Sequence, residues 1–202
     1  MKQDIILAGV GGQGILSIAF VIASAALEDG LEVKQAEVHG MSQRGGAVQS
    51  HLRLSDERIF SDHIPKGEAD RILSVEPLEA LRYADYLRPD GMVVSSRTPF
   101  VNIPDYPDQE TILSKIREIR RRVIVDSEKL AREAGSSRTQ NMVMLGAASR
   151  FLLVKEDRLL KFIRVLFERR GESLVAANLK AFELGRRAAG EANVDPSPGR
   201  KG

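Results

Sequence analysis

The chain has 202 residues, 43% of them hydrophobic, and its formal net charge is +2. This length suits one α/β domain that buries about 70% of its unfolded surface without disulfide or metal support. The nearly balanced charge argues against a nucleic-acid partner, which would require a concentrated basic face. The sequence contains no cysteine. It therefore excludes disulfides, a thiolate nucleophile, zinc–thiolate sites and iron–sulfur ligation by this chain.

The first residues, MKQDIILAGVGGQGILS, have the features of neither a signal peptide nor a membrane span. Asp4 precedes a short apolar run that glycines interrupt. A signal peptide needs a basic start, a longer apolar stretch and a small-residue cleavage site. A membrane-spanning helix needs about 18 apolar residues in a row. We therefore expect a cytoplasmic protein without a membrane partner.

The first quarter of the chain predicts strand, tight turn, helix and two further strands. Residues 4–8 form a short, mainly apolar run after which a glycine cluster follows, and residues 15–30 are apolar nearly all round, which is typical of a buried helix. Residues 31–38 predict a second strand. Residues 47–55 alternate with period two and predict a third. Because the loop between them is too short for a helical crossover, we expect the third strand to run antiparallel to the second.

The rest of the chain alternates strands and helices and then becomes helical. Strands followed by helices predict an α/β fold with a mainly parallel, Rossmann-like sheet, helices on both faces and one antiparallel strand. We expect residues 1–190 to form one domain with a helical C-terminal part, and residues 191–202, which are rich in proline and polar residues, to form a flexible tail. The remaining predicted strands are 71–75, 88–96 after a Pro-Asp-Gly turn, and 122–126; helices are expected at 77–87, 110–122 and from 127 onward, with an irregular segment at 99–109 and Asp126 as a helix cap.

A glycine-rich turn joins the first strand to the first helix. The letters GVGGQG match G-x-G-x-x-G, and such a turn can present free backbone N–H groups to a phosphate. Glu37 lies near the end of the second strand, where a dinucleotide enzyme places its ribose-binding carboxylate. Two alternatives remain open: the glycines serve only close packing, and Glu37 is a solvated residue. The candidate ligand-binding residues of the turn are Gly9, Gly11, Gly12, Gln13 and Gly14.

A second candidate is the loop SQRGG before the third strand. The planar guanidinium of Arg44 suits a phosphate or a carboxylate. The adjacent Gly45 and Gly46 leave the backbone bare, so a ligand or another chain can approach closely. We expect Gln43 to join these three residues in a contact loop for an anionic ligand or for a partner subunit. The alternative is a wide turn with a surface arginine.

Other patterns in the sequence do not indicate a functional site. The three histidines, His39, His51 and His63, are twelve residues apart, which matches no compact metal-ligand spacing, so we expect no metal site. No G-x-S-x-G elbow indicates a catalytic triad. The basic run 117–122 is typical of a solvated helix end. No residue is identified as a catalytic acid, base or nucleophile.

Four segments together resemble a known family. They are AGVGGQGILS near the amino terminus, AEVHGMSQRGGAVQSHLRLS after the second strand, EPLEALRY at 76–83 and NMVMLGAAS at 141–149. In this order they resemble the gamma-type subunits of 2-oxoacid:ferredoxin oxidoreductases, and among these the beta subunits of indolepyruvate ferredoxin oxidoreductases. The resemblance covers roughly residues 1–190. The combination of the glycine turn with H-G-M-x-Q-R-G-G is far more specific than either part.

The resemblance implies a coenzyme A-dependent oxidative decarboxylation of indolepyruvate or another aryl pyruvate to an acyl-CoA. In that family, thiamine diphosphate with magnesium and iron–sulfur clusters perform the chemistry, and ferredoxin accepts the electrons. This chain has no cysteine for the clusters and no G-D-G signature of thiamine enzymes. The resemblance therefore implies an accessory catalytic subunit, inactive alone, whose partner is a larger, cysteine-rich alpha-type subunit that carries these cofactors.

Two other readings stay open. The chain could be a stand-alone dinucleotide-binding oxidoreductase that uses the glycine turn, or a purely structural subunit that shapes its partner.

Overall fold

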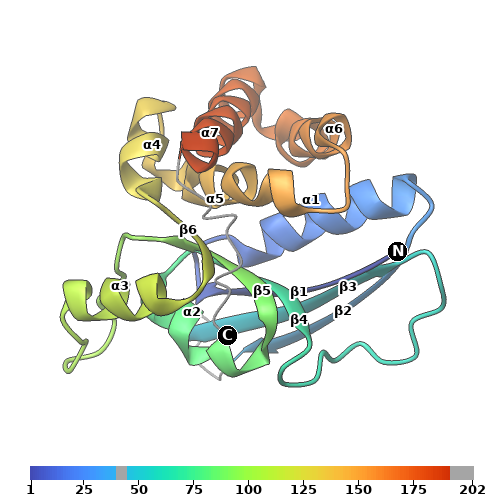
Figure 1. Cartoon of the computed structure of the whole chain (residues 1–202). Helices are drawn as coiled ribbons and strands as arrows, with labels where there is room; N and C mark the ends of the chain where they lie inside the picture. Colours follow the sequence, from blue (N-terminus) through green and yellow to red (C-terminus); the bar gives the residue numbers. More distant parts are fainter. Residues whose placement is uncertain (40–44, 192–202) are drawn as a thin grey trace.

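The structure, a computed structural model, describes residues 1–39 and 45–191 and contains one mixed sheet of six strands (Figure 1). The strand order is β2-β3-β1-β4-β5-β6. β3 pairs antiparallel with both β2 and β1, whereas the β1–β4, β4–β5 and β5–β6 pairs are parallel. The predicted fold, with one antiparallel strand, is confirmed. The bounds are β1 Lys2–Val10, β2 Glu32–His39, β3 Ala47–Ser55, β4 Ala69–Ser74, β5 Leu87–Ser96 and β6 Arg121–Val125.

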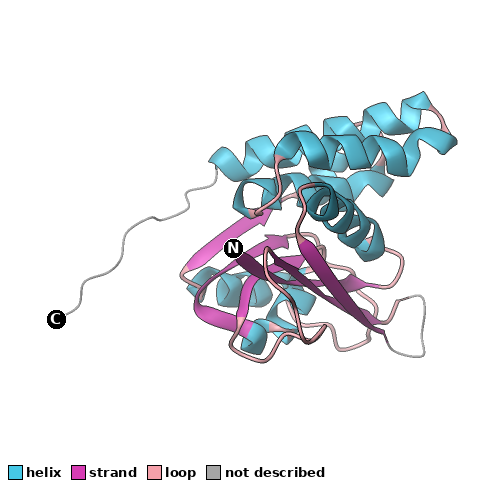
Figure 2. Cartoon of the chain, turned by 90° about the vertical axis from the view of Figure 1, so that its right-hand side faces the viewer, coloured by secondary structure: helices cyan, strands magenta, loops and turns pink. Residues whose placement is uncertain are grey.

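Helices cover both faces of the sheet, as the sequence predicts. Figures 1 and 2 show α2 and α3 on one face and α1 with the helical C-terminal part on the other. Each face has its own hydrophobic core, and the larger one lies under α1 and α5. The bounds are α1 Ile15–Glu28, α2 Pro77–Arg82, α3 Gln109–Glu118, α4 Ser127–Glu133, α5 Gln140–Ala148, α6 Glu156–Phe167 and α7 Glu172–Glu191.

The C-terminal helices are held by an unusually close crossing of α5 and α7. A Cβ atom on Gly146 would lie 1.9 Å from the carbonyl oxygen of Phe182, and one on Gly185 would lie 1.9 Å from that of Val143. Only glycine allows two helix backbones to approach this closely. Every residue of α5 from Asn141 to Ala148 is buried, so α5 is a fixed platform between the sheet and the outer helices.

Several local predictions hold and two need correction. The side chain of Asp126 accepts a hydrogen bond from the amide of Lys129 and caps α4 as predicted. The Pro-Asp-Gly sequence, predicted to be a turn before the strand, lies inside β5. It forms part of a local bulge in which residues 88–91 of β5 lie opposite the single residue Asp70 of β4. The helix predicted to reach residue 87 ends at Arg82, and a short 3-10 turn follows it.

Two further expectations concern the ends of the chain and membranes. The predicted tail falls almost wholly on residues 192–202, which lie outside the described residues. Among the described helices, none combines the length and the apolar character that a bilayer crossing requires.

Candidate functional site

The glycine turn after β1 is built by its own backbone and by one side chain. The amide of Gln13 donates to the carbonyl of Val10 at 3.0 Å, and the side-chain oxygen of Gln13 accepts from the amide of Val10 at 2.8 Å. A Cβ on Gly9 would lie 2.7 Å from the side chain of Ile15. Gln13 and Gly9 therefore form and pack the turn, which is the close-packing role left open above.

Two other glycines of the turn adopt backbone angles that other residues avoid. Gly12 has φ 102° and Gly14 has φ 80°. A Cβ on Gly12 would meet no atom within 4 Å, so this residue faces open space. A Cβ on Gly14 would lie 2.4 Å from the side-chain nitrogen of Asn141, which also donates to the carbonyl of Gly14 at 3.4 Å. Asn141, at the start of α5, thus fixes the point where α1 begins.

The structure brings the two candidate motifs together. The amide of Gly11 donates to the carbonyl of Gly46 at 2.8 Å, and the amide of Gly45 donates to the carbonyl of Gly11 at 3.3 Å. These bonds continue the β1–β3 ladder beyond its last strand pair. Gln43 and Arg44 lie outside the described residues, so their predicted contacts stay predictions.

Two pockets of different character lie on either side of the turn, and Gly12 lines both. The first, of about 430 Å³, is walled by apolar side chains of β1, α1 and β3. The second, of about 530 Å³, is a polar crevice. Its lining residues come from the glycine turn, from the segments after β4 and β5, and from α4 and the turn before α5: Gly12, Gln13, Val75, Thr98, Pro99, Phe100, Glu128, Ser137, Arg138 and Gln140.

The polar crevice occupies the position where α/β sheets bind ligands. It lies at the carboxyl ends of β1, β4 and β5, and the connections from β1 and β4 leave in opposite directions there. Arg138 is exposed at its wall and forms no ion pair with the described residues, whereas Glu128 pairs with Arg132. The arrangement offers one available guanidinium and the start of α1 to an anionic group.

A buried carboxylate beside the crevice was not recognised from the sequence. Glu76 is 0% exposed and lies two residues beyond the end of β4, just before α2. Its side chain accepts hydrogen bonds from the amides of Glu79 and Phe100 and from the hydroxyl of Tyr106. Burial and this bond to Glu76 raise the pKa of Tyr106 above its ordinary value, so the tyrosine remains a hydrogen-bond donor. Its sequence signals are a Glu-Pro pair, which marks a helix start weakly, and its place as the first residue of the family segment EPLEALRY.

The other sequence candidates lie elsewhere. Glu37 is exposed on β2 and accepts a hydrogen bond from Gln35 at 2.7 Å. β3 separates β2 from β1, which places the two strands about 10 Å apart. His51 accepts a hydrogen bond from the amide of Ile64 through Nδ1 at 3.0 Å, and its ring centroid lies 5.4 Å from that of His63. No group of three metal-ligating side chains occurs within the described ranges.

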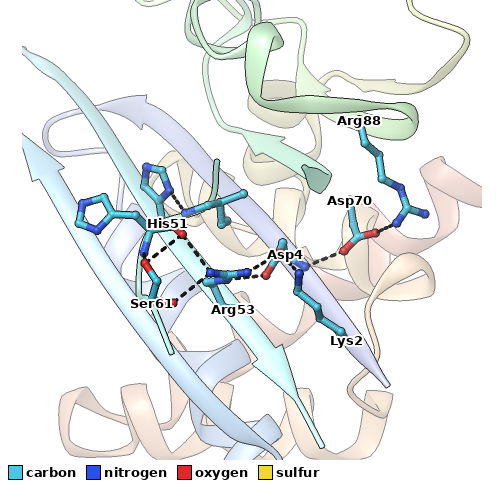
Figure 3. Close-up of polar contacts among 9 residues, drawn as sticks. Lys2, Asp4, His51, Arg53, Ser61, Asp70 and Arg88 are labelled. Carbon is cyan, nitrogen blue, oxygen red and sulfur yellow. Dashed lines mark hydrogen bonds and ion pairs between the residues drawn. The ribbon is translucent and has the colours of Figure 1, made fainter. Parts of the chain in front are cut away.

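The opposite end of the sheet carries a closed polar network (Figure 3). Arg53 of β3 donates to both carboxylate oxygens of Asp4 at 2.8 and 3.0 Å, and Lys2 lies 2.9 Å from the same carboxylate. The amide of Asp4 donates to Asp70, which pairs with Arg88. Here each charge meets an opposite charge of the same chain, which leaves none directed at a ligand.

Comparison with known proteins identifies the family. Residues 4–188 match the family model described as pyruvate ferredoxin/flavodoxin oxidoreductase. The chain belongs to this family. It is 38% identical over 202 aligned positions to indolepyruvate oxidoreductase subunit IorB of Thermococcus kodakarensis, covering 95% of this chain and 98% of the relative. The corresponding subunit of Pyrococcus horikoshii is 39% identical with the same coverage.

A solved structure of the same family shows the same fold. The 2-oxoglutarate:ferredoxin oxidoreductase from Magnetococcus marinus, with 2-oxoglutarate, coenzyme A and succinyl-CoA bound, superposes with a TM-score of 0.77 at 27% identity. The match covers 96% of the chain described here but only 32% of the longer one. A unit like this chain is therefore one part of a larger polypeptide in that relative. The family members that it matches are subunits of 2-oxoacid:ferredoxin oxidoreductases, which are oxidoreductase complexes.

Proposed function

We propose that this chain is the accessory catalytic subunit of an indolepyruvate:ferredoxin oxidoreductase that acts in the cytoplasm and converts an aryl 2-oxoacid to its acyl-CoA. The observation that carries the proposal is the pair of hydrogen bonds between Gly11 and the Gly45–Gly46 turn. These bonds join both family motifs into one surface beside the polar crevice. The names of the two relatives at 38% and 39% identity support the aryl substrate. Residues 1–190 form the gamma-type unit in this proposal.

The redox cofactors belong to a partner in this proposal. The sequence has no cysteine, and the described residues bring together no three metal-ligating side chains, so the chain does not fit an iron–sulfur cluster. We place thiamine diphosphate, magnesium and the clusters on a larger, cysteine-rich alpha-type subunit. There they would supply decarboxylation and carry electrons to ferredoxin.

In this proposal, the role of this chain is to bind coenzyme A at the carboxyl end of the sheet. Arg138 at the crevice wall attracts a phosphate, and the start of α1 favours negative charge nearby. The glycine turn lets the ligand approach the backbone at Gly12, where a side chain would otherwise stand. Gln43 and Arg44, which come directly before Gly45 in the sequence, take part in binding coenzyme A or the oxoacid in this proposal.

The geometry disfavours a stand-alone dinucleotide enzyme. In a dinucleotide fold, the ribose-binding carboxylate ends the strand next to the glycine turn. Here β3 stands between β1 and β2, so Glu37 lies about two strand spacings away. Val48 of β3 also forms a wall of the apolar pocket beside the turn. Titration of the isolated chain with NAD(H) and NADP(H) should therefore show no micromolar binding.

The decisive experiment is co-expression with the larger subunit of the same genome. We expect the co-purified pair, kept without oxygen, to reduce ferredoxin or a viologen dye with indolepyruvate only when coenzyme A is present, and each subunit alone to be inactive. Phenylpyruvate, 2-oxoglutarate and 2-oxoisovalerate in the same assay define the substrate class. Full activity of the larger subunit alone, or failure of the two to co-purify, would reject the proposal.

A purely structural subunit makes a different prediction for the loop before β3. We expect Arg44→Ala to raise the KM for coenzyme A or the oxoacid in a pair that still assembles. A structural role predicts weaker assembly with unchanged KM in the assembled fraction. Arg169→Ala is the control, since Arg169 is an exposed arginine of the helical layer whose side chain makes no hydrogen bond or ion pair with the described residues.

A further inference from the structure

One wall of the polar crevice is an irregular segment, residues 97–108, between β5 and α3. Thr98, Pro99 and Phe100 of this segment line the crevice. Most of its residues are exposed, and it forms no helix or strand. A segment with so little buried surface needs specific attachments to keep one conformation.

The main attachment is the carboxylate of Glu76. One oxygen, Oε1, accepts from the amide of Phe100 at 3.3 Å and from the hydroxyl of Tyr106, so it grips the segment at two points six residues apart. The other oxygen, Oε2, accepts from the amide of Glu79 at 2.8 Å and caps α2. No cation pairs with Glu76 among the described residues, although its side chain is wholly buried.

Two other helices, which are capped by aspartate, show that capping alone does not require a glutamate. Asp108 caps α3 and Asp126 caps α4 through the shorter aspartate side chain, and within the described part of the chain each accepts only from groups of its own helix. Glutamate is not among the favoured capping residues. At position 76 its extra length places the second oxygen against the 97–108 segment, a contact that a cap does not use.

The segment is also tied to the second family motif. The side-chain amide of Asn102 donates to the carbonyl of Gly45 at 2.6 Å. Gly45 in turn donates to Gly11 of the glycine turn. A chain of contacts thus runs from the buried carboxylate through the crevice wall to both glycine motifs.

We propose that Glu76 is a positioning residue, which sets the shape of the coenzyme A crevice by holding residues 97–108 at Phe100 and Tyr106. This inference rests on the proposed function, because it assigns the crevice the same ligand. Glu76 does not touch the ligand and acts through the wall that it holds. Loss of the hydrogen bonds from Phe100 and Tyr106 to Glu76 weakens coenzyme A binding and leaves the reaction on the partner subunit intact.

Three variants test the inference. Glu76→Gln keeps the size and one capping oxygen but sets an NH2 group against the amide of Phe100, which can only donate, whereas the hydroxyl of Tyr106 can turn to accept. Tyr106→Phe removes only one of those donors. Glu79→Gln is the matched control: it is a buried glutamate of the same helix, 3% exposed, whose carboxylate pairs with Arg82 and makes no recorded contact with the segment.

Two readouts are needed. In the full chain, amide hydrogen exchange over 97–108 should become faster in Glu76→Gln and Tyr106→Phe and stay unchanged in Glu79→Gln. In the assembled pair, the first two variants should raise the KM for coenzyme A about tenfold, the size of one lost hydrogen bond. The kcat at saturating coenzyme A should remain within about twofold of the wild type.

The outcomes separate this inference from the proposed function. An inactive wild-type pair overturns the proposed function and this role together. An active wild-type pair with unchanged KM in Glu76→Gln overturns the positioning role alone, and so does unchanged exchange over 97–108. If Glu76→Gln fails to fold, Tyr106→Phe decides in its place, because it leaves the cap of α2 untouched.

Discussion

The two ends of the sheet both carry charged and polar groups, but in the described part of the chain these groups are paired at one end, whereas some are unpaired at the other. At the amino end of the parallel strands, Asp4, Arg53, Asp70 and Arg88 satisfy one another inside the chain. At the carboxyl end, Arg138 and the backbone of Gly12 face a crevice without such partners among the described residues. The comparison separates stability from binding: the closed end holds the fold, and the open end leaves polar groups available to the ligand that we propose.

The largest effect on stability is expected at the closed end. Arg53→Met leaves the carboxylate of Asp4, which is 0% exposed, without its bidentate partner. Breaking a buried pair from one side typically costs about 3–5 kcal/mol, and because Lys2 still contacts this carboxylate we expect a loss in the lower part of that range. Urea unfolding should show this loss. Arg117→Met, which removes an exposed pair with Glu110, is the control and should change the free energy of unfolding by less than about 0.5 kcal/mol. Equal losses in both variants would contradict the special role of the closed end.

A smaller loss is expected where the open end meets the core. Gly14→Ala forces a side chain into a left-handed conformation and against Asn141, and we expect a loss of about 1–3 kcal/mol. Gly12→Ala meets no atom and should lose only about 1–2 kcal/mol, through strain. If contact with Asn141 is the cause of the difference, Asn141→Ala will cost less in the Gly14→Ala background than in the wild type. Additive losses would contradict that account.

His51 of β3, which contacts Ile64 and His63 of the loop after this strand, should make the free energy of unfolding depend on pH. Burial, with His63 and Arg53 nearby, lowers the pKa of His51 below its ordinary value, and Asp62 opposes the shift. The unfolded chain therefore binds a proton more readily than the folded one as pH falls through about 6.5. Stability is full above that pH and decreases below it. Urea midpoints between pH 7.5 and 5 should show a decrease that His51→Gln reduces; an unaltered slope would exclude His51 as its source.

The smallest effect on stability should accompany a large effect on binding. Arg138 is exposed, and Arg138→Gln should change the free energy of unfolding by no more than about 0.5 kcal/mol. In the assembled pair it should raise the KM for coenzyme A about tenfold or more, since a charged hydrogen bond to phosphate is lost. Arg150→Gln, an exposed arginine of the helical layer, is the control. Equal KM values in the two variants would move the ligand away from the polar crevice.

Much of this architecture could be predicted from local patterns. The alternation in 47–55 gave the bounds of β3, and the glycine turn was placed correctly because strand, turn and helix follow one another directly. The antiparallel direction of β3 followed from the short connection. Its place between β2 and β1 could not be predicted, because strand order depends on contacts between distant parts of the chain.

The site was predicted only where its residues are contiguous. The two glycine motifs stood out in the sequence, but their mutual hydrogen bonds did not. Asn141 acts on a residue 127 positions earlier, and Glu76 acts on Tyr106, which lies 30 positions later. No periodicity or spacing indicates such contacts. The side chain of Gln13 is long enough to bind the amide of Val10 in its own turn, and the residue also lines the polar crevice, so its ligand contact stays a prediction.

The place of β3 between β1 and β2 also has a consequence for folding. After residues 1–39 have left the ribosome, the segments of β1 and β2 have both been synthesised. Neither can yet pair with β3, which lies between them in the folded sheet. Only when Ser55 emerges can β3 join the two by hydrogen bonds on both of its edges. Neither β1 nor β2 therefore gains a partner on this side of the sheet before β3 is present, and a nascent chain that stops before residue 47 exposes two unpaired strands to the cell's chaperones.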